Sequence, residues 1–314
     1  EGDGVFESIR EPIRIGREAE IPVQMTHHKI GAWRNFGRAS ESLALIEEAR
    51  AGGVDITYDQ SPYTASTTGL SAIIPRWAQE GDGLAGRLRD PGTRARVVEE
   101  MIEWVEMRFA GDPSKIQLVS CDFEDDNAAF PEEMAGLTLA DVLVARDDPA
   151  TPEAVADLIL EIDAAGGCGA IFHGFDERDV QTLLTGEHGM IGSDGSLVRY
   201  GEASPHPRGY GTFPRVLGRY VRELGVIYFE EAVRRMTSAP AHRLGFHDRG
   251  RIAPGMVADI TVFDPETVVD RATFQNPHQY PVGIRFVFVN GVLVARDGRV
   301  TGERPGVVLR RSTR

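Results

Sequence analysis

Three short stretches of the sequence carry side chains that can do chemistry. Ser-Asp-Gly at 193–195 follows an apolar run and is bounded by glycines, and Pro-His-Pro-Arg lies at 205–208. The third stretch, Thr-His-His-Lys at 26–29, is far upstream. Carboxylate and imidazole groups bind metal ions, and the cationic groups bind anions. We therefore predict that the three stretches meet at one end of an α/β barrel, around a metal ion.

His27 and Lys29 are predicted to share one face of a strand, with His28 on the other face. The reason is that successive strand residues point to opposite faces. An imidazole and an ammonium group at the carboxyl end of a parallel strand lie where barrel enzymes hold their active sites. His27 is thus a candidate metal ligand. The alternative is that both histidines lie in a strand-end loop and make ordinary hydrogen bonds.

Asp194 and Arg208 also have two interpretations each. A carboxylate at the position of Asp194 can bind a metal and accept a proton from water, but Asp-Gly is also a common turn. Prolines beside Arg208 restrict its backbone, which favours bidentate binding of a carboxylate. The alternative for Arg208 is an exposed loop arginine.

Three further residues are candidates with a structural alternative. Tyr63 can donate a hydrogen bond to a developing oxyanion or can simply pack. His173 ends a predicted strand, so its side chain either lines the predicted site at the end of the barrel or lies in the core. His206 has the same ambiguity as Arg208, its neighbour in the Pro-His-Pro-Arg stretch.

The composition is that of an ordinary globular protein and excludes several classes. The chain has 314 residues, 41% hydrophobic and 26% charged, enough for one large domain with or without a small one. The net charge of -14 argues against nucleic acid or an anionic membrane surface as a partner. No apolar stretch approaches the roughly 18 residues of a membrane span, and no signal peptide is evident. Phosphate-binding loops, nucleophile elbows and CxxC zinc pairs are absent.

The two cysteines, Cys121 and Cys168, are too few for a disulfide scaffold. Each is predicted to be a buried apolar residue in a reducing compartment. The predicted location is therefore the cytoplasm.

Hydrophobic periodicity predicts alternating strands and helices at both ends of the first 249 residues, as in a parallel sheet. Helices are predicted over 5–19, 40–50, 93–109, 151–166, 176–184, 213–224 and 229–237, and strands over 21–25, 54–58, 116–121, 170–173 and 190–193.

Two regions break this alternation. Residues 67–150 are predicted to be a mostly helical insertion or lid between two barrel strands. From residue 250 the chain becomes rich in predicted strands, with a hairpin around Asn290 and Gly291. The predicted domains are thus a barrel portion over 1–249 and a small β module over 250–314.

Taken in order, these pieces resemble the D-aminoacylase (N-acyl-D-amino-acid deacylase) family of the amidohydrolase superfamily. The resemblance covers essentially the whole chain and is carried by residues 26–29, 59–65, 190–195, 205–208 with 211–215, and 250–259. It implies the C-terminal portion of a TIM-like (β/α)8 barrel, a helical insertion near the site and a small β-sandwich.

The resemblance also implies roles for single residues. His27 matches a zinc ligand, and Lys29 and Arg208 match residues that bind the substrate's carboxylate. Asp194 matches the acid/base, which can ligate a second metal, and Tyr63 matches a tyrosine that helps to hold the substrate. The implied cofactor is zinc, with one tight site. The implied reaction is zinc-dependent hydrolysis of an N-acyl-D-amino acid to a carboxylic acid and a free D-amino acid.

The chain departs from the family pattern in what it lacks. The family's His-x-His pair, its bridging cysteine and a further histidine ligand all lie N-terminal to the matched region, and Ser61 replaces a tyrosine. We therefore expect that an N-terminal segment of the same polypeptide is missing, and that the chain alone binds zinc weakly and hydrolyses little. Two alternatives are a dihydroorotase- or hydantoinase-like hydrolase and a non-catalytic binding module, although a binding module has no need of Asp194.

Overall fold

The sheet beneath the predicted site has three parallel strands, β1 (Val23–Met25), β2 (Ile56–Gln60) and β6 (Gly189–Ile191), in the order β1-β2-β6. They belong to a computed structural model that describes residues 4–81, 83–123, 130 and 133–310. The strands predicted over 21–25, 54–58 and 190–193 are confirmed, with slightly different ends. Because parallel strands end at a common edge, the residues that follow them are brought together there.

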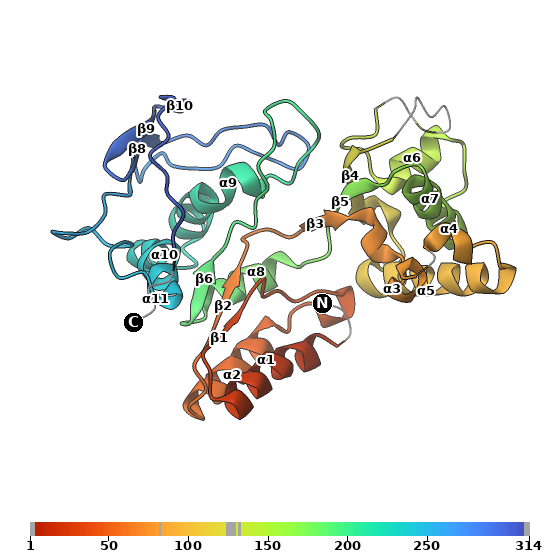
Figure 1. Ribbon diagram of the computed structural model, residues 1–314, viewed down its shortest axis with the longest axis horizontal. Helices are drawn as coiled ribbons and strands as arrows, with labels where there is room; N and C mark the ends of the chain where they lie inside the picture. The colour runs from red at the N-terminus through yellow and green to blue at the C-terminus, as the bar shows by residue number, and fades with distance from the viewer. Residues whose placement is uncertain (1–3, 82, 124–129, 131–132, 311–314) are drawn as a thin grey trace.

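Two N-terminal helices cover one face of this sheet (Figure 1). Helix α1 (Val5–Ala19) buries Val5, Phe6, Ile9 and Ile13, which recur at helical spacing and form one apolar stripe. Helix α2 (Ala39–Ala51) is the crossover from β1 to β2, a connection that parallel strands require. Both helices were predicted from periodicity and are confirmed.

Asp179 fixes the start of α2 from a distant part of the chain. It lies on α8 (Glu177–Thr185), is 2% exposed, and accepts hydrogen bonds from the backbone N–H groups of Gly37 (2.7 Å) and Ala39 (3.0 Å). The first N–H groups of a helix have no partner within the helix, so a buried carboxylate there is favourable. Asp179 thereby holds the loop that leads from the Thr-His-His-Lys stretch into α2.

We expect Asp179→Ala to lower the free energy of unfolding by about 1–3 kcal/mol, because the buried N–H group of Ala39 and the part-buried N–H group of Gly37 lose their acceptor. Urea unfolding followed by circular dichroism measures the change. Asp157→Ala is the control, since Asp157 forms an exposed ion pair with Arg94 and its substitution should cost less than about 1 kcal/mol. Equal effects of the two substitutions would rule out the capping role.

The predicted fold class is confirmed in part. The structure is mixed α/β with a C-terminal β module, but in the part of the chain that it describes the three parallel strands do not close into a ring. The prediction that these strands are part of a TIM-like (β/α)8 barrel therefore stays a prediction.

A second sheet, antiparallel and in the order β3-β5-β4, organises the insertion. Its strands are β3 (Ser66–Gly69), β4 (Ile116–Cys121) and β5 (Cys168–Phe172). Figure 1 shows them with α3 to α7 on one side of the molecule, apart from the parallel strands. The helices are α3 (Arg76–Gln79), α4 (Leu84–Arg87), α5 (Pro91–Phe109), α6 (Leu139–Ala145) and α7 (Pro152–Ala164), with the short turns η2 (Leu70–Ile73) and η3 (Pro113–Lys115).

The structure corrects the prediction that residues 170–173 form a barrel strand. They belong to β5, which pairs antiparallel with both β3 and β4, so the insertion continues past residue 150 through α7 and β5. A short apolar run reads as a buried strand in either kind of sheet, and periodicity does not reveal its partner.

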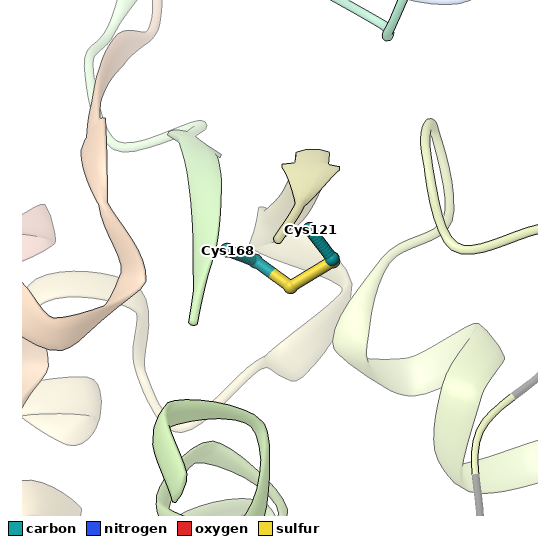
Figure 2. Close-up of a disulfide and its surroundings, with 2 residues drawn as sticks. All are labelled: Cys121 and Cys168. Carbon is teal, nitrogen blue, oxygen red and sulfur yellow. A yellow bond between two sulfur atoms is a disulfide. The ribbon is translucent and has the colours of Figure 1, made fainter. Parts of the chain in front are cut away.

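The prediction that the two cysteines are separate apolar residues is wrong. Cys121 and Cys168 form a disulfide, shown in Figure 2, between the paired ends of β4 and β5. The antiparallel register sets the two residues directly opposite, with their Cα atoms 4.1 Å apart. The argument for a reducing compartment therefore no longer holds, and the cytoplasmic location stays a prediction.

The C-terminal module is one four-stranded antiparallel sheet in the order β10-β9-β8-β7. The predicted hairpin is confirmed: Asn290 (φ 49°) and Gly291 (φ 77°) turn β8 back into β9, as the positive φ angles of a type I′ turn require. The implied sandwich is not seen, since the described part of the module has this single sheet. The strands are β7 (Ile260–Phe263), β8 (Ile284–Val289), β9 (Val292–Arg296) and β10 (Arg299–Val300).

Between the parallel sheet and this module lie four helical segments, and the two that contain residues 216–221 and 232–236 pack with α8 and β6 in one apolar cluster. The helix predicted over 213–224 begins earlier, at Arg208, directly after Pro207. None of the described helices is long and apolar enough to cross a membrane. The segments are α9 (Arg208–Arg215), the π-helical η4 (Val216–Glu223), α10 (Phe229–Met236) and α11 (Ser238–Leu244), and η1 (Trp33–Asn35) lies upstream.

Candidate active site

A cavity of about 930 Å³ runs along the parallel sheet, from residues that precede β1 and β2 to the carboxyl ends of β1, β2 and β6. Its lining includes all five residues predicted to form the site, namely His27, Lys29, Tyr63, Asp194 and Arg208. The topology explains this convergence, because the stretches that carry these residues follow neighbouring parallel strands or open the helix beyond them. The structure thus places the predicted residues at one cavity, while their chemical roles stay predictions.

Asp194 lies at the centre of the polar groups. One carboxylate oxygen, Oδ2, is 2.8 Å from Nη2 of Arg208, and the other, Oδ1, is 3.5 Å from Nε2 of His27. The residue has a positive φ of 50°, and it is followed by Gly195, where a Cβ atom would come within 2.8 Å of the Cα atom of Gly209. Its side chain is 38% exposed, so a molecule in the cavity can reach the carboxylate.

The backbone of His27 is held in place by Asp59, which the sequence reasoning assigned no role. His27 has a left-handed φ of 56°, and its N–H donates to Oδ1 of Asp59 at 3.1 Å. Gln24 donates to the other oxygen of Asp59 at 2.8 Å. The sequence does contain a signal that Asp59 lies at the site, since it is a carboxylate near the carboxyl end of a predicted strand.

His28 makes an ordinary hydrogen bond, as in the alternative to metal binding. Its Nε2 lies 3.1 Å from the hydroxyl oxygen of Ser42 in α2, and the side chain is buried. Burial, with a smaller contribution from the charge of Lys29, lowers the pKa of His28 to about 4. His28 is therefore a neutral core residue, although its edge borders the cavity.

Arg208 is a buried residue in the first turn of a helix rather than an exposed loop arginine. Its backbone N–H donates to Nδ1 of His206 at 3.0 Å, and Nε2 of the same imidazole lies 3.0 Å from the carbonyl oxygen of Ala65. Because Nδ1 accepts, Nε2 must carry the proton that it donates to Ala65. Burial, followed by the charge of Arg208, lowers the pKa of His206 to about 3, so the ring is neutral.

Lys29 and Tyr63 border the same cavity from different sides. The Lys29 ammonium lies 5.4 Å from the ring centre of Phe175, a residue that carried no local signal because no motif surrounds it. Tyr63 is 4% exposed and lies edge-on to His206, with the Arg215 guanidinium over its ring. Burial raises the pKa of Tyr63, so its hydroxyl keeps its proton and can act as a donor.

His173 does not border this cavity. Its Nε2 lies 3.1 Å from Oε1 of Gln117, and its ring packs edge-on against Phe274 at 4.6 Å. Burial lowers the pKa of His173. The structure thus favours the packing interpretation for this residue.

The donor set fits part of a zinc site. Two ligands about 2.1 Å from a tetrahedral zinc lie about 3.4 Å from each other, and Nε2 of His27 and Oδ1 of Asp194 are 3.5 Å apart. Among the residues that the structure describes, no group of three or more His, Cys, Asp or Glu side chains could hold a metal ion. Since a catalytic zinc usually has three protein ligands, these two residues fit the ion but do not complete its site.

The chain is similar to D-aminoacylases in both sequence and structure. The chain is 38% identical over 312 residues to a D-aminoacylase of Alcaligenes xylosoxydans xylosoxydans, covering 99% of this chain and 53% of that protein. A solved structure of a D-aminoacylase mutant with CuCl2 is also similar (TM-score 0.75, 36% identity, 99% of this chain and 54% of that one).

A third similar protein is the N-acyl-D-glutamate deacylase of Bordetella bronchiseptica, solved with zinc and a phosphonate mimic of the tetrahedral intermediate. It has a TM-score of 0.74 and 33% identity, over 99% of this chain and 54% of that one. The chain thus spans about half the length of the relatives it matches. The model of the amidohydrolase family matches residues 124–295, more than half of the chain, and the chain therefore belongs to the amidohydrolase family.

Proposed function

We propose that this chain forms part of an enzyme that hydrolyses the amide bond of N-acyl-D-amino acids, giving a carboxylic acid and a free D-amino acid. The observation that carries the proposal is the Asp194 carboxylate, which lies between His27 and Arg208 at an open cavity. The 38% identity to a D-aminoacylase supports this substrate class. We use "the complete enzyme" for this chain together with the polypeptide segment that supplies the other metal ligands.

Asp194 is the proposed general base and acid. Its exposed carboxylate accepts a proton from the attacking water and returns that proton to the amine nitrogen as the amide bond breaks. A bound zinc ion supplies a lowered pKa for water and polarises the amide carbonyl. His27 and Asp194 would hold that ion, and Asp59 keeps the His27 backbone in the required conformation.

Lys29 and Arg208 are proposed to bind the carboxylate of the amino acid. Both border the cavity, and Arg208 is buried and held at its backbone by His206, so its planar guanidinium loses little freedom on binding. Fixing the carboxylate orients the neighbouring amide bond toward Asp194. Tyr63, which borders the same cavity, is the proposed neutral donor.

The partner proposed for this chain is the polypeptide segment that corresponds to the other half of the relatives. Three parallel strands leave β1 with a free edge in the described sheet, and the side chains of β1 are only half-buried. Strands of a parallel sheet are normally covered on both faces. A further parallel strand that carries histidine ligands would cover this edge and add donors to the pair already present.

We expect the chain alone to bind zinc weakly and to hydrolyse N-acyl-D-amino acids little, because only two ligands converge among the residues that the structure describes. Isothermal titration calorimetry with zinc measures this, and His27→Ala should remove what binding there is. A tight, stoichiometric site in the isolated chain, lost in His27→Ala, would overturn the need for further ligands.

The proposed reaction is tested by assaying the complete enzyme with zinc on a panel of substrates. N-acetyl-D-amino acids should release the free D-amino acid, while their L enantiomers and hydantoins should react much more slowly. Hydrolysis of hydantoins without hydrolysis of N-acetyl-D-amino acids would replace the proposal with a cyclic-amide hydrolase.

A further inference from the structure

A segment of the C-terminal module, residues 270–278, reaches across to the candidate site. Asp270 forms an ion pair with Arg215 of α9 at 3.0 Å, and the carbonyl of Phe274 accepts a hydrogen bond from Gln117 of β4 at 3.1 Å. At the end of the segment, the ring of His278 is hydrogen-bonded to the hydroxyl of Tyr210 at 2.9 Å. The segment is therefore tied to α9 and to the insertion at once.

The ring of Phe274 is the central contact of this segment. It packs edge-on against His173 (4.6 Å between ring centres), His206 (5.0 Å) and Tyr63 (6.3 Å). His206 and Tyr63 also pack edge-on against each other at 5.1 Å. Such contacts fix the plane of a ring because its edge and face differ in charge. The orientation of the His206 imidazole thus depends on Phe274.

The orientation of His206 matters because both of its ring nitrogens are engaged. Nδ1 accepts from the N–H of Arg208, one of the helix-start N–H groups that lack a partner within α9. Nε2 donates to Ala65, on the chain that leads from Tyr63 into β3. Rotation of the ring would break both bonds and release the first turn of α9, which carries Arg208 toward Asp194.

We propose that Phe274 is a positioning residue for Arg208, acting through the imidazole of His206. The proposal rests on the proposed function in one respect, that Arg208 binds the substrate's carboxylate. It means that the C-terminal β module helps to set the geometry of the carboxylate-binding end of the site. A phenylalanine that only packs would instead affect stability and every substrate alike.

The structural part is tested in the isolated chain by nuclear magnetic resonance. In the wild type, His206 should show a protonated Nε2 and an unprotonated Nδ1, and the Arg208 amide should exchange slowly with solvent. Phe274→Leu should speed exchange of the Arg208 amide at least tenfold relative to amides in the core of α9. Unchanged exchange would overturn the proposal, whatever the substrate of the enzyme proves to be.

The functional part is tested in the complete enzyme with an N-acyl-D-amino acid and with its carboxamide, which lacks the carboxylate. Phe274→Leu should raise KM for the acid about tenfold and should lower kcat/KM for the carboxamide much less, since the contact of Arg208 with Asp194 serves both substrates. Phe286→Leu, in β8 and packed against Phe288, is the matched control and should change neither.

Equal losses for the acid and the carboxamide in Phe274→Leu would assign Phe274 to packing alone and overturn the proposal. If the wild type does not prefer the acid, the proposed carboxylate binding fails, and the exchange measurement then decides the positioning role separately. The double variant Phe274→Leu with His206→Asn should lose less kcat/KM for the acid than the product of the two single losses. Both substitutions disturb the same series of contacts, from Phe274 through His206 to Arg208. If Phe274→Leu does not fold, Phe274→Met takes its place with the same expectations.

Discussion

Asp194→Asn in the complete enzyme is expected to lower kcat for an N-acyl-D-amino acid by about a thousandfold or more, with KM changed little. The amide keeps the size of the side chain and can still accept hydrogen bonds, but it cannot take up the proton from water. The Asp194 carboxylate is 3.5 Å from His27 and 2.8 Å from Arg208, whereas Asp59, another carboxylate at the cavity, already accepts hydrogen bonds from His27 and Gln24. Steady-state kinetics with a D-amino-acid oxidase readout measure the change.

Asp55→Asn is the matched control for this experiment. Asp55 borders the same cavity but precedes β2, at the opposite end of the strand from the site, and is ion-paired with Arg243 at 2.8 Å. It should leave kcat within about twofold of the wild type. If Asp194→Asn kept most of the wild-type rate, Asp194 would not be the acid/base.

Arg208→Ala is expected to raise KM for N-acyl-D-amino acids by about a hundredfold, because a buried charge partner for the carboxylate is removed. The carboxamide of the same substrate should lose much less. Arg208→Lys should fall between the wild type and Arg208→Ala, since lysine keeps the charge without the planar fork. The same steady-state assay separates KM from kcat.

The structure adds a second consequence for Arg208→Ala. Because Nη2 of Arg208 is 2.8 Å from the Asp194 carboxylate, its removal also takes away the partner that orients the proposed base. We therefore expect a fall in kcat as well, smaller than that of Asp194→Asn. A selective loss on substrates without a carboxylate would contradict the assigned role.

Much of the secondary structure was predictable from local sequence. The apolar stripe of Val5, Phe6, Ile9 and Ile13 predicts α1, and the β1–α2–β2 unit follows from a strand, a crossover helix and a second strand in order. Asn290 and Gly291 predict the C-terminal hairpin because few other residues adopt its positive φ angles. In these cases the deciding interactions lie within one helix or one turn.

The polar composition of the site was also predictable. Residues that follow the strands of one parallel sheet lie at the same edge of it, so His27 and Asp194 were expected to converge, and their donor atoms are 3.5 Å apart. Arg208 was placed in the right neighbourhood, but its position in a helix was missed. Proline signals both a loop and the start of a helix, so the Pro-His-Pro-Arg stretch alone does not distinguish them.

What the sequence by itself determined is therefore the local elements, the parallel order of β1 and β2, and the groups available for chemistry. Only the tertiary structure decided that β5 pairs with β3 and β4, and that Cys121 lies opposite Cys168. It also decided that Asp179 caps α2 and that Phe274 packs on His206. Each of these contacts joins residues distant in the chain, and periodicity, turn chemistry and capping report only on neighbours within a few residues.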